Sequence, residues 1–287
     1  MGLLTRFFSG MLAAPGAAGG CAACGQAILG PKLEALGRAW HPGHFRCSAC
    51  NRALGARFKV GRHGEPFCTS HPEEEVVCMG CGHVHAGTVP TPLGVQCPVC
   101  RAEAVHDLPA ASALLVQAQT ALRQAGLPWW PQTFPLRLVA AVEWRERPRQ
   151  MGFILTLLTT HPSGRLERVV QEIQALSGLP RLNLGMVLAH ELGHAWVFHH
   201  RLAGLPRAVE EGFCEYCSSL WLNTLQEPRA LALARHLADN PDPVYGGGYR
   251  KVLKVNEGDG LAGVLGWLGQ QVPEACTGNP RFRNLEP

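Results

Sequence analysis

The residues with the most specific spacing are two histidines four positions apart, in the segment His190-Glu191-Leu192-Gly193-His194. Residues four apart lie on one face of an α-helix, so both imidazoles can bind one metal ion while Glu191 stands beside it. Zinc held in this way lowers the pKa of a bound water towards ~7, and a neighbouring carboxylate can accept the proton. We therefore predict a hydrolytic zinc centre with His190 and His194 as ligands and Glu191 as general base.

A third ligand is expected from the next predicted helix, which carries the adjacent carboxylates Glu210 and Glu211. Two imidazoles and one carboxylate leave a fourth coordination position open, as in catalytic rather than structural zinc sites. The spacing alone does not decide between the two glutamates. Glu215, one turn further on, would face a ligand histidine and orient it. A solvated helix face is the alternative reading for Glu210 and Glu215.

The elements that must position these residues are predicted mainly as helices, from apolar side chains that recur every three to four residues. A helix capped by Asn183 is expected to carry the metal motif as far as about His200. The carboxylate pair lies on a helix that follows Pro206, in the favoured first-turn position, and reaches about Gln226. Two further helices are expected over 110–125 and 228–238.

Short apolar segments supply the predicted sheet. Residues 135–144 and 152–158 are rich in Leu, Val, Ile and Phe and are typical of strands. The segment 166–176 fits a helix period as well as a strand. We therefore expect an α+β fold in which residues 106–287 form a mainly helical domain with a small sheet.

Composition changes sharply near residue 105, since nine of the twelve cysteines precede it. Eight of these nine form C-x-x-C pairs, with histidines at ligand spacing between them. Free or disulfide-bonded cysteine is the alternative interpretation, but this pattern of cysteine pairs and histidines is typical of zinc sites in a reducing compartment. We therefore expect a cytoplasmic protein.

Three tetrahedral zinc sites are predicted from these pairs. Their ligands are Cys21, Cys24, His41 and His44 in the first, Cys47, Cys50, Cys68 and His71 in the second, and Cys78, Cys81, Cys97 and Cys100 in a zinc ribbon. His83 and His85 follow the first pair of the ribbon closely and are alternative ligands there. Such closed sites stabilise the fold by ~10–16 kcal/mol of zinc binding and present a surface to a protein partner.

Two of these motifs resemble known families. The first two zinc sites, with the run WHPGHFRC at 40–47, resemble a LIM domain in which His44 replaces the usual Cys. The segment HELGHAW followed by EEGF resembles the metal-binding pattern of gluzincin aminopeptidases. When this chain and the family pattern are aligned on Glu-Gly-Phe, the resemblance implies that Glu211 is the third metal ligand.

A wider resemblance covers most of the chain. The LIM domain, a second zinc module and then GLPRL, LAHELGHAW, VEEGFCEY, LWL and PVYGGGYR, in this order, resemble the DA-one family of LIM-containing zinc peptidases. The resemblance implies a gluzincin-like peptidase that acts on proteins. We expect a short, bacterial-type version without ubiquitin-interacting motifs.

Several further residues are weighed as catalytic or structural. Tyr245 lies in a segment with three consecutive glycines, predicted as a loop, where a phenol could stabilise the oxyanion; a packed aromatic at a turn is the alternative. Cys214 and Cys217 are expected as packed small side chains on a helix. His199 and His200 are interpreted as surface histidines. Trp129 and Trp130 are expected in a core or domain interface.

Charge and hydropathy limit the kinds of partner that this protein is expected to bind. The formal charge of +4, from 26 basic and 22 acidic residues, is small and scattered, which argues against nucleic acid. No stretch approaches the ~20 apolar residues of a membrane span. We expect a disordered leader over 1–20, a LIM domain over 21–72, a zinc ribbon over 76–105 and the peptidase domain over 106–287, with one catalytic and about three structural zinc ions.

The sequence therefore predicts a zinc-dependent endopeptidase whose LIM and ribbon modules bind a protein substrate, a ubiquitin-like protein or another protein partner. The alternative is a LIM-type interaction adaptor with an inactive peptidase domain. An aminopeptidase is a third reading, which would need an acidic anchor for the substrate amine, and none is identified before the metal motif.

Overall fold

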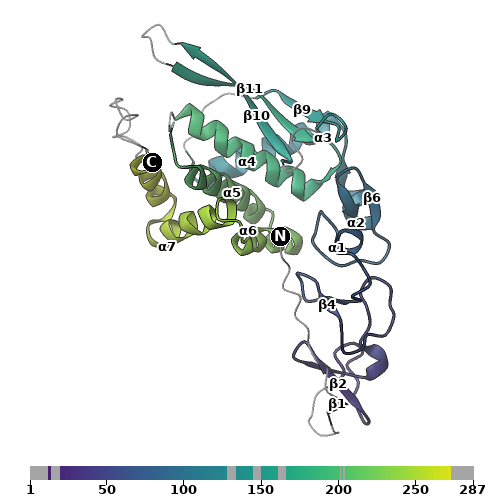
Figure 1. Cartoon of the computed structure of the whole chain (residues 1–287). Coiled ribbons are helices and arrows are strands. Elements are labelled where there is room, and N and C mark those ends of the chain that lie inside the picture. Colours follow the sequence, from purple (N-terminus) through teal and green to yellow (C-terminus); the bar gives the residue numbers. More distant parts are fainter. Residues whose placement is uncertain are drawn as a thin grey trace. The chain divides into compact units, whose positions relative to one another are not determined.

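The computed structural model of the chain describes residues 12–13, 20–127, 134–144, 150–160, 166–200, 202 and 204–272. Most of the predicted leader over 1–20, together with Trp129 and Trp130, lies outside these residues. The chain divides into two compact units, Met1–Glu103 and Ala104–Pro287 (Figure 1). The first unit contains the predicted structural zinc modules and the second contains the predicted catalytic motif.

Short antiparallel strand pairs and single helical turns make up the N-terminal unit. Its strands are β1 (Leu12–Ala13), β2 (Lys32–Ala35) and β3 (Arg38–Trp40), which form one sheet, and the pairs β4 (Lys59–Val60) with β5 (Pro66–Phe67) and β6 (Val89–Thr91) with β7 (Gly94–Gln96). Its helical turns are η1 (Pro42–His44), α1 (Glu73–Val76) and α2 (Pro98–Ala102). Elements this short do not hold a shape by themselves, so cross-links between them are required.

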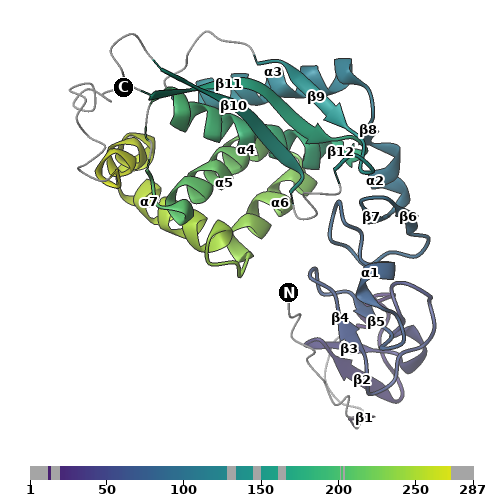
Figure 2. The same ribbon diagram turned by 45° about the horizontal axis from the view of Figure 1, so that its top comes forward.

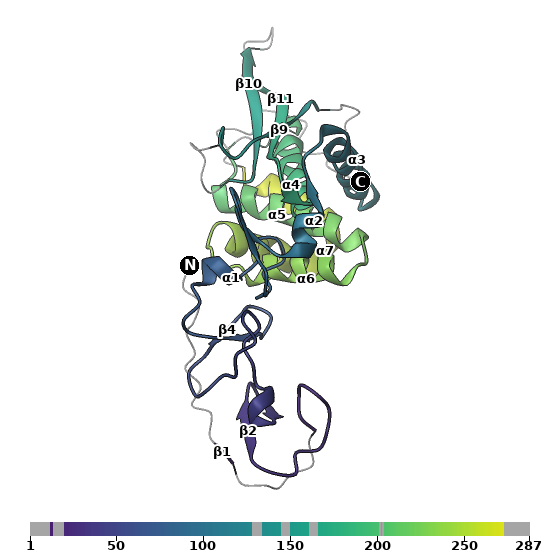
Figure 3. The same ribbon diagram turned by 90° about the vertical axis from the view of Figure 1, so that its right-hand side faces the viewer.

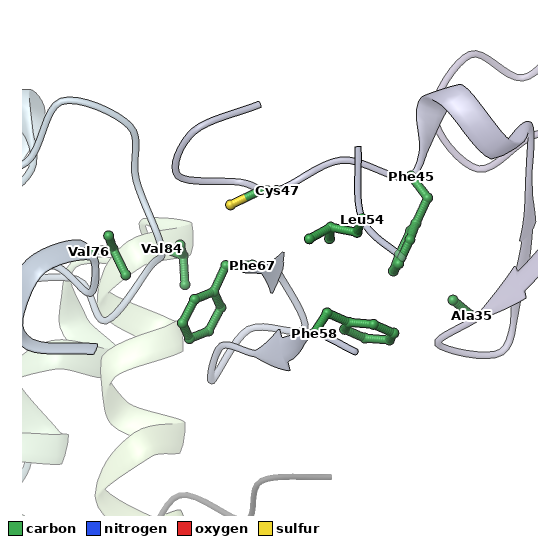
Figure 4. Close-up of a cluster of buried hydrophobic side chains, with 8 residues drawn as sticks. All are labelled: Ala35, Phe45, Cys47, Leu54, Phe58, Phe67, Val76 and Val84. Atoms are coloured by element: carbon green, nitrogen blue, oxygen red, sulfur yellow. The ribbon is translucent and has the colours of Figure 1, made fainter. Parts of the chain in front are cut away.

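The apolar core of this unit is small and continuous. Phe45 packs edge-to-face against Phe58 with ring centroids 4.9 Å apart, and both rings are fully buried, as is Phe67 (Figure 4). Val76 and Val84, which come after the second predicted zinc site, join the same cluster. The second and third zinc modules therefore share one core.

The C-terminal unit contains a three-stranded sheet in the order β10-β11-β9. Its strands are β9 (Leu136–Val139), β10 (Gly152–Thr160) and β11 (Leu166–Leu176), with β8 (Ala104–Val105) and β12 (Leu179–Pro180) forming a separate pair. β11 pairs antiparallel with β10 and parallel with β9. The ambiguous segment 166–176 is thus a strand. The predicted strand over 135–144 is too long, because hydrogen bonds from Glu143 and Trp144 to Ala140 and Ala141 close a turn after Val139.

Five helices of the described chain pack with this sheet: α3 (Leu108–Gln124), α4 (Arg181–His199), α5 (Arg207–Thr224), α6 (Pro228–Asp239) and α7 (Tyr245–Gln270). In Figure 2 the sheet lies across one side of α4. Helix α5 packs on the opposite side of α4, and α7 packs on α5. Figure 3 shows α3 beside α4, and the far end of the β10–β11 hairpin extending past the helices. None of the described helices has the length and hydropathy that crossing a membrane requires.

The central helix α4 is apolar on nearly every side, as expected of a helix enclosed by other elements. Leu184, Leu188 and Leu192 are completely buried. The predicted cap was wrong: α4 begins at Arg181 directly after β12, and Asn183 is buried inside its first turn. Pro180 holds the N-cap position instead, because the chain turns from the strand straight into the helix.

The predicted glycine-rich loop was also wrong, because Tyr245 is the first residue of α7. Its glycines serve close packing rather than a turn. A Cβ atom on Gly248 would lie 1.9 Å from the carbonyl oxygen of Ala208 in α5, and one on Gly246 would lie 2.0 Å from that of Asn240. Gly248 therefore lets α7 start against the helix that carries the predicted metal-binding carboxylates, and Gly246 lets α7 start close to Asn240.

Candidate metal centre

His190 and His194 lie one turn apart on α4 and present their rings on one face, with centroids 5.1 Å apart and planes at 70°. Their side chains are only 16% and 14% exposed. The neighbouring positions Val187, Leu188 and Leu192 are buried and fix the helix against the sheet and α5. The motif is therefore held on a rigid element rather than on a loop.

The carboxylate of Glu211, from α5, meets both imidazoles. Its Oε2 atom lies 3.3 Å from Nε2 of His190 and 3.7 Å from Nε2 of His194. Tetrahedral zinc with bonds of about 2.0–2.1 Å places its ligand atoms roughly 3.3 Å apart. Both distances from the carboxylate to the imidazoles are thus close to the spacing between two ligands of one zinc ion.

The two remaining glutamates of α5 face the other nitrogens of these histidines. Oε1 of Glu210 lies 2.9 Å from Nδ1 of His194, and Oε1 of Glu215 lies 3.6 Å from Nδ1 of His190. A carboxylate in this position fixes the tautomer and orientation of a ligand imidazole. The Glu210 contact was not predicted from the sequence, although adjacent helical residues point about 100° apart and so can reach both sides of one ring.

Glu191 is almost completely buried beside the two histidines. Burial raises the pKa of its carboxyl, against the opposing effect of His190 and His194. A Cβ atom on Gly152, the first residue of β10, would lie 2.6 Å from Oε1 of Glu191 and 2.5 Å from Val187. Glycine at this position therefore allows the strand to approach the carboxylate.

Negative charge is in excess around the two imidazoles, since four carboxylates surround them. These are Glu191, Glu210, Glu211 and Glu215. Burial opposes a charge on His190, but the hydrogen bond to Glu211 and the charges of the neighbouring glutamates raise its pKa to about 9. Such a donor set, with two nitrogens and excess carboxylate, fits a divalent cation such as zinc.

Cys214 also brings its Sγ atom within 4.8 Å of a nitrogen of each histidine. It is fully buried beneath the motif, where a Cβ atom on Gly193 would lie 3.0 Å from that sulfur. Burial raises the pKa of its thiol well above the usual value. Glu211 is the better third donor, because its Oε2 atom lies 3.3 Å and 3.7 Å from the two Nε2 atoms. Cys217 is likewise buried on α5, as predicted for packed small side chains.

Tyr245 and Arg207 lie at the rim of the centre. The Tyr245 ring is 6.4 Å from that of His190, at an interplanar angle of 35°. Nε of Arg207 lies 3.8 Å from Oε1 of Glu211, and the neighbouring Tyr245 raises the pKa of the Arg207 guanidinium. Sequence reasoning missed Arg207, for which the one signal was its position four residues before Glu211.

The two histidines after the motif differ from each other. His199 is exposed, as predicted. His200 is half-buried and its ring packs on Trp196 with centroids 4.1 Å apart, so its interpretation as a surface residue was wrong. His200 is the C-cap of α4, four residues after Trp196, so the two rings lie on the same side of the helix end.

Three Cys/His clusters in the N-terminal unit bring their ligand atoms within 4.8 Å of one another. They consist of Cys21, Cys24, His41 and His44; of Cys47, Cys50, Cys68 and His71; and of Cys78, Cys81, Cys97 and Cys100. The clusters indicate structural zinc binding. They also supply the cross-links that the short elements of this unit require.

His44 takes part in the first cluster, with Nδ1 3.6 Å from Sγ of Cys21. A sulfur and a nitrogen bound to one tetrahedral zinc are roughly 3.5 Å apart. Although burial opposes ionisation, the backbone N–H of His41 and other donors lower the pKa of Cys21 to about 5. The thiolate form that zinc requires is therefore favoured before zinc binds.

His83 does not join the third cluster, whose four members are all cysteines. Its Nδ1 hydrogen-bonds Glu65, and its ring stacks on His63 with centroids 3.8 Å apart. Both partners lie in the second zinc module, so this histidine connects that module to the ribbon. His85 lies nearby, with its ring centroid 6.2 Å from that of His83.

Matches to two known protein families fall in different units of the chain, one in the N-terminal unit and one in the C-terminal unit. Residues 21–76 match the LIM domain family, and residues 134–235 match the DA1-like family, described as Protein DA1. The chain therefore contains a LIM domain followed by a DA1-like domain, within a mixed α and β fold. The motif histidines of α4 and the carboxylates of α5 both fall inside the DA1-like region.

Three similar proteins each match a short region of this chain. Paxillin homolog 1 of Caenorhabditis elegans is 43% identical over 65 residues, which are 22% of this chain and 16% of that protein. A LIM domain-containing protein of Dictyostelium discoideum is 40% identical over 63 residues, 21% of this chain and 34% of that protein. Paxillin-B of the same organism is 38% identical over 71 residues, 23% and 12% respectively. The chain thus matches about a third or less of the length of each relative.

Proposed function

We propose that this protein is a zinc-dependent peptidase that hydrolyses peptide bonds in protein substrates, and that its LIM domain and zinc ribbon bind the substrate or another protein partner, such as a ubiquitin-like protein, in the cytoplasm. One observation carries the proposal: Oε2 of Glu211 lies within 3.7 Å of Nε2 of both motif histidines. Zinc held by His190, His194 and Glu211 would supply Lewis acidity towards a water molecule and a substrate carbonyl.

Glu191 is suited to act as the general base. It follows His190 directly and lies beside both ligand histidines, and burial raises the pKa of its carboxyl above the usual value. A raised pKa favours proton transfer near neutral pH. It would accept a proton from the attacking water and deliver it to the leaving amine. Tyr245, at the rim, is suited to donate a hydrogen bond to the carbonyl oxygen as negative charge develops there.

β10 offers a path for the substrate. It begins at Gly152 beside Glu191, and β11 is its one partner among the described strands, so its other edge pairs with none of them. An extended polypeptide can add to such an edge as a further strand, with main-chain hydrogen bonds. Leu155, Leu157 and Leu158 are exposed further along β10 and would contact apolar side chains of that polypeptide. A chain bound along the whole strand passes the centre internally, which supports an endopeptidase.

The decisive experiment replaces the base without removing a ligand. Glu191→Gln protein should retain about four zinc ions per chain, measured by elemental mass spectrometry, and should no longer cleave an unfolded substrate such as casein. Glu257→Gln, at an exposed position on α7, is the matched control and should cleave as wild type does. Cleavage by Glu191→Gln at the wild-type rate would exclude Glu191 as the base.

A second candidate function is a LIM-type interaction adaptor with an inactive peptidase domain. It is favoured by the similarity to paxillin homologues over the short matched region. To separate the two functions, partners captured by Glu191→Gln protein are incubated with wild-type protein. New cleavage products support the peptidase, and partners that stay intact while bound support the adaptor.

A further inference from the structure

Three side chains connect the second zinc module to the zinc ribbon. Nδ1 of His83, two residues after the ribbon ligand Cys81, hydrogen-bonds Oε1 of Glu65 in the second module. The other carboxylate oxygen, Oε2, accepts a hydrogen bond of 3.1 Å from the backbone N–H of His63. Nε2 of His63 lies 3.0 Å from the carbonyl oxygen of Cys81, which brings the chain of contacts back to the ribbon. We call Glu65, His63 and His83 the interface network.

Both histidine rings of the interface network are held in one tautomer. A carboxylate and a carbonyl oxygen only accept, so Nδ1 of His83 and Nε2 of His63 each donate. The two rings also stack, with centroids 3.8 Å apart and planes at 14°. An isolated ion pair at a surface contributes little to stability, but here the same two rings make two hydrogen bonds and a stacking contact between the modules.

Apolar packing brings the two modules together beside this network. Phe67 of β5 is fully buried, and Val84 of the ribbon belongs to the same apolar cluster (Figure 4). A Cβ atom on Gly61, which directly follows β4, would lie 2.7 Å from Cγ2 of Val84. Glycine at this position therefore lets the loop that carries His63 approach the ribbon closely.

On the side of the second module, the network is tied to zinc ligands through β5. Glu65 directly precedes this strand, and the ligand Cys68 directly follows it. The backbone N–H of Cys68 lies 3.3 Å from Sγ of Cys47, another ligand of the same cluster. The carbonyl oxygen of Pro66 accepts a hydrogen bond of 2.9 Å from the N–H of Ser48, next to Cys47. A shift of Glu65 would therefore move the strand that positions these ligands.

On the ribbon side, the network is tied to the first pair of cysteines. The carbonyl oxygen of His83 accepts a hydrogen bond of 2.9 Å from the N–H of Cys78. The N–H of Gly82 bonds the carbonyl oxygen of Cys78 at 2.8 Å, which closes the turn that contains Cys81. Metal binding by the cysteines orders such a turn, since elements this short do not hold a shape by themselves. The positions of His83 and of the Cys81 carbonyl therefore depend on the zinc of the ribbon.

We propose that zinc binding at the second cluster of the LIM domain and zinc binding in the ribbon are positively coupled through the interface network. With zinc bound, the ribbon holds His83 and Cys81 where they fix Glu65 and His63, and these keep β5 in the position that its ligand requires. The coupling is reciprocal by linkage, so zinc at either site strengthens binding at the other. It goes beyond the proposed peptidase function and does not depend on it. The surface that the LIM domain presents to a partner then depends on the zinc content of the ribbon.

The three clusters can be followed one by one because they differ in the number of sulfur ligands. The first cluster has two cysteines, the second has three and the ribbon has four. Cadmium-113 can replace zinc in such sites, and its NMR resonance depends on the number of sulfur ligands. Titration of the metal-free full chain with cadmium-113, in competition with a chelator, therefore gives an affinity for each cluster.

The test is a double-mutant cycle on the affinity of the second cluster. Cys100→Ser removes a ribbon ligand outside the interface network, and it should weaken cadmium binding at the second cluster about fivefold or more. In the variant Glu65→Ala/His83→Ala the same change should have no further effect, because the network is already absent. Unchanged affinity of the second cluster in Cys100→Ser would overturn the proposal. An equal weakening with and without the network would overturn it too, and would assign the coupling to the apolar core.

The first cluster and an exposed glutamate provide the controls. The affinity of the first cluster should stay the same in all these variants, and a change there would indicate a general loss of structure instead of coupling through the network. Glu74→Ala, at an exposed position on α1, should behave as wild type does. His83→Phe retains a ring for stacking but not the Nδ1 donor, so it should lose part of the coupling.

Amide exchange tests the same connection without a binding measurement. In the zinc-loaded chain, Cys100→Ser should speed exchange of the N–H groups of Gly61 and His63, which both bond Glu65. Glu65→Ala/His83→Ala should show faster exchange at His63 even with the ribbon intact. Slow exchange at both positions in Cys100→Ser would contradict transmission from the ribbon to the second module.

Discussion

Oε1 of Glu210 lies 2.9 Å from Nδ1 of His194, while Nε2 of the same ring faces Glu211. The two adjacent glutamates of α5 therefore contact the two different nitrogens of one imidazole ring. His190 has the same arrangement, with Glu211 at Nε2 and Glu215 at Nδ1. One helix thus supplies both the third ligand and the carboxylates that orient the other two.

Loss of the Glu210 carboxylate, which orients the ligand His194, should weaken metal binding without abolishing it. Substitution of a carboxylate that orients a ligand histidine typically costs about 10–100-fold in metal affinity. We expect Glu210→Ala to lower the affinity for one zinc ion per chain by this factor, measured by competition with a chromophoric chelator. Glu257→Ala should leave all zinc affinities unchanged, and an equal affinity in Glu210→Ala would contradict the role assigned here.

Glu211 and Cys214 make opposite predictions about the third ligand. If Glu211 binds the metal, Glu211→Ala should contain one zinc ion fewer per chain than wild type, while Cys214→Ala should keep the full number. The 3.3 Å and 3.7 Å distances from Oε2 of Glu211 to the two Nε2 atoms favour the carboxylate. Elemental analysis of both variants after dialysis gives the answer, and the reverse pattern would assign the site to the cysteine.

The parts of this protein that could be predicted from sequence depend on short-range spacing. The Cys/His clusters and the helix over 228–238 rest on neighbours within a few positions, and both appear in the structure. The helix predicted over 110–125 is also confirmed, and it starts two residues earlier because Asp107 caps it. Within one turn or one helix, the spacing of residues already determines which side chains lie together.

The parts that could not be predicted depend on contacts between distant segments. Three glycines in a row after Tyr245 favour a loop by intrinsic preference, and only the approach of Gly248 to Ala208 explains why they are helical. Nothing in the sequence distinguishes Arg207 from other surface arginines, and the effect of Tyr245 on its pKa depends on where α7 begins. Tertiary packing overrides local preference at both places.

The LIM domain uses His44 where its family usually has cysteine, and this ligand can be tested directly. His44→Cys should retain the zinc of the first cluster, because a thiolate suits the same tetrahedral position. His44→Ala should lose that zinc and unfold the sheet of β1, β2 and β3, seen as rapid amide exchange over 32–40. Retention of zinc by His44→Ala would show that another group completes the site.

Packing between α5 and α7 should be intolerant of even one methyl group. The Cβ atom of Gly248→Ala would lie 1.9 Å from a backbone oxygen, so the helices must separate. Overpacking of this kind costs typically about 1–3 kcal/mol, and each kcal/mol lowers Tm by about 2–4 °C in a domain of this size. Calorimetry should show the loss for Gly248→Ala. Gly266→Ala, where a Cβ atom meets nothing within 4 Å, should be as stable as wild type or slightly more so.

Gly152 provides the sharpest test of the path along β10, because its change alters the approach to the base without touching a ligand. A methyl group there would lie 2.6 Å from Oε1 of Glu191, so either the strand or the carboxylate must move. Displacements of about 1 Å at a reacting group can cost roughly 10²-fold in rate. We expect Gly152→Ala to bind zinc as wild type does and to lose most of its kcat/KM in casein cleavage, while Gly258→Ala, whose Cβ atom meets nothing within 4 Å, retains it. Full activity of Gly152→Ala would show that the start of β10 does not border the reacting atoms.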